Sequence, residues 1–348
     1  MTAPRMAVID LRSDLLAPPD NALVSEILAA LREPAEFELR GDPRQARVEE
    51  RIARLLGTED ALLFPTCTMA NQCALALLTR PGDAVLTQLD AHVLVSEAGG
   101  AAAIAGVQIM AAAGDPAALD VEAWRDALSA ARSVQAPRVG AIVIENTHNR
   151  SGGRIVAHSA VQSIINTARE RGVKVHLDGA RLFNASVASG VEASELARGF
   201  DTIALSLNKG LGGLFGAALA GSHAVIAEAL ALRQRLGGGM RRMGVFAAAV
   251  ESCLDNIPRL AEDHRRARFL AEGISARSDI ACLEKVETNI VMIKAPPPWR
   301  SAEALRDALA AKGVLTLAMP GGRLRMTIHR GIDDAAIHRA TEVFASLL

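Results

Sequence analysis

The chain of 348 residues has few cysteines, no tyrosine and almost no net charge. Its four cysteines, Cys67, Cys73, Cys253 and Cys282, lie far apart with no Cys-X-X-Cys spacing. This pattern argues against a zinc site or a disulfide framework, and it favours a reducing, cytoplasmic environment. The net charge of −1 lacks the basic excess expected of a nucleic-acid-binding protein. We therefore expect neither a bound metal nor a nucleic-acid partner.

Long hydrophobic runs are also missing. The most apolar segment, 98–114, is rich in alanine and glycine and contains Gln108. It falls short of a membrane-spanning helix and is more typical of a buried helix followed by a strand. The N-terminal residues carry charges and lack the apolar centre of a signal peptide, so we expect no targeting segment and no membrane association.

The length and hydrophobic content predict one large domain and one smaller domain. Short apolar runs alternate with helical stretches over residues 61–65, 84–88, 139–146, 173–180 and 201–208. Strands that are apolar throughout, each leading into a helix, indicate a mostly parallel sheet with both faces covered. The predicted fold is a doubly wound α/β domain. From about residue 240, fewer strands interleave with helices, which predicts a small α+β domain.

Three residues at the ends of predicted neighbouring strands point to a particular chemistry. Asp178 and Arg181 follow one apolar run, and Lys209 follows the next, among glycines. This set suits pyridoxal 5′-phosphate (PLP): a lysine to bond the aldehyde, an acid for the ring nitrogen, and an arginine for a substrate carboxylate. Taken singly, each has an ordinary structural alternative as an exposed lysine, a helix cap or a surface ion pair. The segment 210–216 lacks the third spaced glycine of a dinucleotide fingerprint.

Other candidates lie at similar places. Thr66, Cys67 and Thr68 stand between a strand and a helix, where backbone N–H groups favour a phosphate, although a plain helix cap is the simpler alternative. His92 and His148 also follow predicted strands, where open α/β sheets bind ligands. Each histidine is a candidate for stacking or proton transfer, against the alternative of a half-buried structural residue.

In order along the chain, these motifs resemble the threonine aldolase family, the aromatic amino acid β-eliminating lyase/threonine aldolase group of fold type I PLP enzymes. The resemblance rests on eight segments: 9–14, 65–72, 91–100, 145–153, 176–185, 206–213, 236–242 and 323–331. It implies a large domain with a mostly parallel seven-stranded sheet between helices. The domains would be an extended segment at 1–20, a PLP-binding domain at 21–240, and an α+β domain at 241–348.

The resemblance also implies residue roles. Lys209 would carry PLP as a Schiff base, Asp178 would pair with the ring nitrogen, His92 would stack on the ring and assist proton transfer, and His148 would lie near the substrate hydroxyl. Ser13, Arg181 and Arg325 would hold the substrate carboxylate. Cys67, Thr68 and Arg241 would bind the phosphate, with Arg241 contributed by a neighbouring subunit. We expect a homodimer or homotetramer with shared sites.

The implied reaction is cleavage of a β-hydroxy-α-amino acid, such as L-threonine or L-allo-threonine, to glycine and an aldehyde. Two alternatives remain: a PLP-dependent β-elimination on the same scaffold, and a PLP-binding protein without activity. The chain departs from the family pattern at Leu39, where the family usually has tyrosine, and at Cys67, where it usually has glycine. Arg40 and Arg44 add charge beside Leu39, which suggests an acidic or larger substrate.

Overall fold

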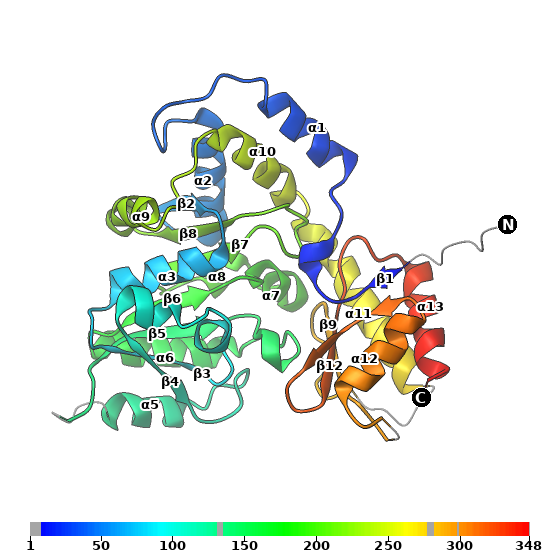
Figure 1. The fold of residues 1–348 in the computed structure, drawn as a ribbon. Coiled ribbons are helices and arrows are strands. Elements are labelled where there is room, and N and C mark those ends of the chain that lie inside the picture. Colours follow the sequence, from blue (N-terminus) through cyan, green and yellow to red (C-terminus); the bar gives the residue numbers. More distant parts are fainter. Residues whose placement is uncertain (1–7, 131–134, 277–281, 298, 348) are drawn as a thin grey trace.

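The computed structural model describes residues 8–130, 135–276, 282–297 and 299–347. A large sheet with its helices forms one part of the molecule, and a smaller α+β unit packs beside it (Figure 1). The first seven residues of the predicted N-terminal segment lie outside the described ranges.

The large sheet has seven strands, as the resemblance to the threonine aldolase family implies. They are β2 (Asp60–Phe64), β3 (Ala84–Gln88), β4 (Gln108–Ala112), β5 (Val139–Glu145), β6 (Lys174–Asp178), β7 (Thr202–Ser206) and β8 (Ala217–Gly221). Their order across the sheet is β2-β8-β7-β6-β5-β3-β4. All neighbours from β4 to β7 run parallel, whereas β8 is antiparallel to both β7 and β2. The mostly parallel arrangement is confirmed.

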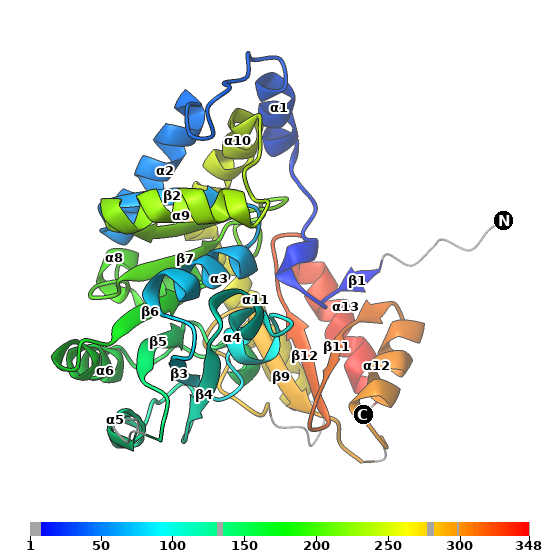
Figure 2. The ribbon, with the colours of Figure 1, turned by 60° about the vertical axis from the view of Figure 1, so that its left-hand side comes forward.

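Helices cover both faces of this sheet (Figure 2). One face packs against α2 (Pro43–Leu56), α5 (Val121–Ala130), α6 (His158–Glu170), α7 (Leu182–Ser189) and α8 (Ala193–Leu196). The other packs against α3 (Cys67–Leu78) and α9 (His223–Arg235), with α4 (His92–Val95) and the π-helical turn η2 (Ala101–Ala105) further along. Successive residues of β2 alternate between the two cores: Ala61 and Leu63 face one, and Leu62 and Phe64 the other. Burial on both sides explains why the strands are apolar throughout.

The smaller unit is built on the antiparallel sheet β11-β12-β9, with β9 (Ile290–Lys294), β11 (Leu317–Met319) and β12 (Arg323–Thr327). Its helices are α11 (Leu260–Ser275), α12 (Ala302–Ala311) and α13 (Asp334–Ala345). The N-terminal strand β1 (Ile9–Asp10) pairs in parallel with β10 (Val314–Leu315). The two ends of the described chain therefore meet in this unit.

Near Leu260 the chain leaves the hydrophobic core of the large sheet and enters the core of the smaller unit. Helix α10 (Met243–Leu254) buries Met243, Phe246 and Val250 in the core of the large sheet, and it packs on α1 (Asn21–Ala30) and α2. Residues from Ala267 onward join the core of the smaller unit. The sequence analysis places the domain boundary at residue 240. The packing of α10 instead groups this helix with the large sheet.

Local sequence explains the bounds of α2. Asp42 is its N-cap, and Oδ1 accepts from the N–H groups of Arg44 (2.8 Å) and Gln45 (3.1 Å). Pro43 occupies the first turn, where its missing N–H costs nothing. Gly57 ends the helix at φ +66°, a left-handed conformation that glycine adopts without a steric penalty. No helix within the described ranges is both long and apolar enough to cross a membrane.

Candidate active site

A small enclosed cavity lies beyond the carboxyl ends of the parallel strands. It is lined by Cys67, Asn71, His92, Glu145, Thr147, Asn149, Asp178, Ala180, Arg181 and Lys209. These residues come from the ends of β5 and β6, the turn after β7, and the first turns of α3 and α4. Five of the ten predicted site residues line it: Lys209, Asp178, His92, Arg181 and Cys67.

Lys209 reaches the cavity because the chain turns sharply after β7. Its carbonyl accepts from the N–H of Gly212 at 2.8 Å, and Gly212 has φ +82°. Gly213 packs directly on the carbonyl of Leu207, where a Cβ would clash. The turn therefore depends on these glycines, and it leaves the half-buried Lys209 side chain at the cavity wall.

Asp178 is the last residue of β6 and is buried. Its Oδ1 accepts from the N–H of Ala180 at 3.2 Å, and its Oδ2 accepts from Nδ2 of Asn71 at 2.9 Å. Oδ1 of Asn71 contacts Nε2 of the buried His176 at 3.0 Å, and Nδ1 of His176 contacts Oγ1 of Thr202 at 2.8 Å. Burial lowers the pKa of His176 to about 4, so this imidazole is neutral at physiological pH. Asp178 is thus held from behind by an ordered polar network.

His92 begins α4, where its N–H donates to Oε2 of Glu145 at 2.5 Å. Its ring Nδ1 lies 2.8 Å from Oε1 of Glu97. Burial lowers the pKa of His92, but the hydrogen bond to Glu97 and the carboxylates of Asp178 and Glu145 outweigh burial, and the net shift is upward. His92, Glu97 and Asp178 offer three ligand atoms within 4.8 Å of one another. However, the amide nitrogen of Asn71 already donates to both carboxylates.

The first turn of α3 begins beside the cavity and carries backbone N–H groups. Thr66 is the N-cap, and its hydroxyl accepts from the N–H of Met69 at 3.1 Å. The N–H groups of Cys67 and Thr68 precede the first helical hydrogen bonds and stay open to a ligand. Burial and Asp178 raise the pKa of the Cys67 thiol well above its usual value, so this side chain is neutral. Cys67 lines the cavity and Thr68 does not, and the predicted phosphate contacts of this turn stay a prediction.

Two buried arginines meet at one amide oxygen. Arg181 forms a two-pronged ion pair with Asp14 at 2.8 Å, and Oδ1 of Asn149 accepts from Arg181 (3.2 Å) and from Arg325 (3.0 Å). Asp14 neutralises only one of the two guanidinium groups. Burial and the neighbouring Arg181 lower the pKa of Arg325 to about 10. Arg325 does not itself line the cavity, but it contacts the lining residue Asn149, and its predicted contact with a substrate carboxylate stays a prediction.

Ser13 and His148 lie outside the cavity lining. Ser13 precedes Asp14, and its hydroxyl accepts from the N–H of Leu15 at 3.3 Å. His148 is fully buried, with Nδ1 2.8 Å from Oγ of Ser151 and with Nε2 unpartnered among the described residues. The predicted contacts of both residues with substrate stay predictions.

Arg241 is exposed, far along the chain from the cavity residues. Its Nη1 donates to the carbonyl of Phe37, and its guanidinium lies over the Phe37 ring, 4.9 Å from the centroid. The chain's own cavity does not include Arg241. Its predicted phosphate contact in a neighbouring subunit stays a prediction.

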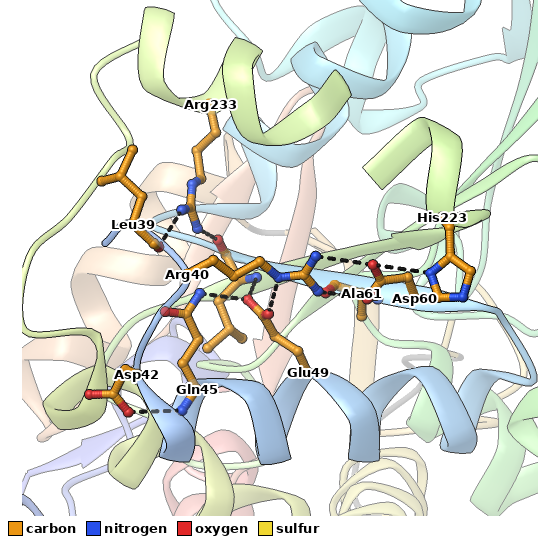
Figure 3. Close-up of polar contacts among 10 residues, drawn as sticks. Leu39, Arg40, Asp42, Gln45, Glu49, Asp60, Ala61, His223 and Arg233 are labelled. Atoms are coloured by element: carbon orange, nitrogen blue, oxygen red, sulfur yellow. Dashed lines mark hydrogen bonds and ion pairs between the residues drawn. The ribbon is translucent and has the colours of Figure 1, made fainter. Parts of the chain in front are cut away.

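The segment around Leu39 is fastened to the sheet by two arginines (Figure 3). Arg40 binds Oε2 of Glu49 at 2.7 Å and both oxygens of Asp60 at 2.6 and 3.0 Å. The fully buried Arg233 donates to the carbonyls of Leu39 (3.3 Å) and Leu63 (2.5 Å). The backbone of Leu39 is therefore held in place by Arg233.

Arg40 and Arg44, which suggested an acidic substrate, are both paired with carboxylates of the chain. Arg40 is neutralised by Glu49 and Asp60, whose carboxylates raise its pKa above the ordinary arginine value even though burial lowers it. Arg44 pairs with Glu26 at 3.4 Å and with Glu33 at 2.8 Å. Neither arginine lines the cavity. Both cations have carboxylate partners within the chain, so they carry no unpaired charge there, and the preference for an acidic or larger substrate stays a prediction.

Sequence reasoning missed several polar residues of the site, namely Asp14, Asn71, Glu97, Glu145 and Asn149. Each lies inside a motif used above to identify the family, so their positions carried a signal that was not assigned a role. These residues bind partners that lie far away in the chain, as Asp14 binds Arg181. Spacing within a motif does not reveal such contacts.

Comparisons with known proteins agree with this geometry. A family model described as "Beta-eliminating lyase" matches residues 10–296. The low-specificity L-threonine aldolase 1 of Arabidopsis thaliana is 35% identical, over 97% of this chain and 96% of that protein. The low specificity L-threonine aldolase of Escherichia coli (strain K12) is 34% identical, over 91% and 93%. The solved threonine aldolase of Leishmania major superposes with a TM-score of 0.84 at 21% identity, over 97% and 99% of the two chains, and has the same fold.

The match of the family model, the full-length similarity to both aldolases and the shared fold lead to one conclusion. The chain belongs to the beta-eliminating lyase family and, within it, to the threonine aldolases.

Proposed function

We propose that the chain is a PLP-dependent carbon–carbon lyase that cleaves β-hydroxy-α-amino acids, such as L-threonine and L-allo-threonine, to glycine and an aldehyde. The observation that carries the proposal is the convergence of Lys209, Asp178, His92 and Arg181 on one cavity at the carboxyl ends of the sheet. Family membership points to the same reaction.

The residues of the cavity fit PLP. Lys209 supplies the amine that bonds its aldehyde, and Asp178 supplies a buried carboxylate for its ring nitrogen. The open N–H groups at the start of α3 suit its phosphate. When bound, PLP supplies an electron sink for the pair released from the Cα–Cβ bond.

The remaining residues orient the substrate and handle its proton. Arg181 and Arg325 bind the substrate carboxylate in place of Oδ1 of Asn149, which occupies the same two donors in the free site. This clamp sets which bond at Cα stands perpendicular to the cofactor ring. His92 holds a proton near the substrate hydroxyl, with His148 contributing to the preference between threo and erythro isomers.

Product analysis tests the proposal. Purified protein supplied with PLP is incubated with L-threonine and L-allo-threonine, and glycine and acetaldehyde are measured. We expect both products in equal amounts, and their loss in Lys209→Ala. Lys174→Ala is the matched control, because Lys174 pairs with Asp201 on the surface. Undiminished cleavage by Lys209→Ala would overturn the assignment.

The family description favours one second candidate, β-elimination from an amino acid with a good leaving group. On threonine that reaction would release water and yield 2-oxobutyrate and ammonia, so measuring these products beside glycine and acetaldehyde separates it from aldol cleavage.

We also propose a cytoplasmic homodimer or homotetramer in which Arg241 of one subunit contacts the phosphate in the next. Supporting this assembly are the exposed position of Arg241 and the exposed apolar side chains of α1.

A further inference from the structure

Asn71 fixes the direction of the hydrogen bonds behind the cavity. Its amide nitrogen donates to Oε1 of Glu97 at 2.8 Å and to Oδ2 of Asp178 at 2.9 Å, which uses both of its hydrogens. Its oxygen must therefore accept, so His176 carries its proton on Nε2 and accepts from the hydroxyl of Thr202 at Nδ1. The neutral His176 adds no charge to the network.

Glu97 is the buried charge of this network. Its side chain has no exposed surface. Oε1 accepts from Asn71 and faces Nδ1 of His92, and Oε2 accepts from Nε2 of Gln72. Asn71 and Gln72 are neutral donors, which satisfy hydrogen bonds but leave the charge uncompensated. A buried carboxylate needs a cation, and His92 is the only group in contact with Glu97 in the described structure that can become one.

The other charged groups around His92 favour the same state. Asp178 at the end of β6 and Glu145 at the end of β5 are both carboxylates in the same cavity wall. Lys209, in the turn after β7, is the one cation among the lining residues near them besides Arg181, which Asp14 already pairs. The neighbouring Cys67 is a neutral thiol. Carboxylates outnumber free cations around the imidazole.

We propose that Glu97 is a positioning residue that holds His92 as an imidazolium, with Nδ1 bound to Glu97 and Nε2–H as the one ring donor left for the site. In this state His92 donates a hydrogen bond through Nε2 and accepts none. For the reaction, a consequence that rests on the proposed function, His92 donates a hydrogen bond to the substrate oxygen and is not the base that accepts the hydroxyl proton at neutral pH. The upward shift in the pKa of His92 agrees with this state.

Deuterium exchange at the imidazole C2 carbon tests the proposal, because its rate reports the ionisation of each histidine. The holoenzyme is exchanged over about pH 5 to about pH 9, and the peptide carrying His92 is read by mass spectrometry. We expect a midpoint for His92 above about 6.5 in the wild type. Glu97→Gln keeps the shape and removes the charge, so the midpoint should fall by at least about one unit, a tenfold change in the ionisation constant. Glu97→Asp should restore part of the shift.

The chain offers a matched control in His158, whose Nε2 lies 3.3 Å from Oε1 of Glu195 at the half-exposed surface. Glu195→Gln should leave the His92 midpoint unchanged. A wild-type midpoint below 6.5, or the same midpoint in Glu97→Gln, would overturn the proposal. So would exchange at His92 that slows with added zinc and recovers with a chelator, since this would indicate a metal between His92, Glu97 and Asp178. The measurement needs no turnover, so its outcome is separate from that of the aldolase assay.

Discussion

At the scale of single residues, the main electrostatic feature is the buried ion pair between Asp14 and Arg181. Asp14 has no exposed surface, and its two oxygens bind Nε and Nη2 of Arg181. Burial raises the pKa of Asp14, but Arg181 more than offsets burial and holds it well below the usual range. Nε of Arg325 has no partner among the described residues. Asp14 therefore holds Arg181 in place, whereas Arg325 has no carboxylate of its own among the described residues.

We predict that Asp14→Asn lowers the free energy of unfolding at neutral pH by about 3–5 kcal/mol, because it leaves Arg181 buried without a counter-charge. A folded-state pKa below the unfolded value of about 3.9 means that the wild-type advantage is complete above that pH. It is lost as the pH falls through the folded-state pKa. Urea unfolding at several pH values measures both effects.

Asp334→Asn serves as the control for this prediction, because Asp334 forms exposed ion pairs with Arg265 and Arg266. Its effect on stability should be small at every pH. An equal loss in both variants, or a difference for Asp14→Asn that persists unchanged to acid pH, would contradict the account.

At the scale of elements, the start of α2 joins the Leu39 segment to α10. Asp42 caps α2, and Gly244 of α10 packs so closely on the Asp42 carboxylate that a Cβ there would require a shift. The cap thus contributes both to the helix and to the packing of α10.

We expect Asp42→Ala to lower the free energy of unfolding by about 1 kcal/mol, the usual cost of losing an N-cap. Asp42→Asn keeps an acceptor oxygen and should retain most of the stability. Thermal unfolding of the three proteins, followed by circular dichroism, gives the comparison. Equal melting temperatures for Asp42→Ala and the wild type would show that the cap contributes nothing.

How much was predictable differs between elements. The parallel strands and the α2 cap follow from local patterns, such as the apolar run at 139–146 and Gly57 after the helix. The antiparallel course of β8 and the packing of α10 on the large sheet depend on contacts between distant segments. The ion pairs of Arg40 were not predictable from local patterns either, because Asp60 lies twenty residues further along the chain.

At the scale of the whole molecule, an apolar surface remains uncovered on α1. Val24 and Leu28 of α1 are 40% and 55% exposed, and the C-cap residue Leu31 is 48% exposed, although the helix also packs on α10. Exposed apolar side chains gathered on one helix are typical of an interface. A second copy of the chain is the expected partner for this surface.

We predict that Leu28→Glu separates the assembly into monomers, because a charge would be buried in the proposed interface. Light scattering after size-exclusion chromatography measures the mass, and circular dichroism verifies the fold. Phe269→Glu is the control, since Phe269 is 38% exposed on α11 and contacts His338 edge to face. An unchanged mass for Leu28→Glu would place the interface elsewhere.

The central claim is that Lys209 binds the aldehyde of PLP within the cavity that contains Asp178 and His92. Borohydride reduction of the holoenzyme, followed by peptide mapping, tests this claim most directly, because reduction fixes the cofactor on the amine that carries it. We predict a single adduct on the peptide that contains Lys209. An adduct on another lysine, or a protein that takes up no cofactor, would contradict the account.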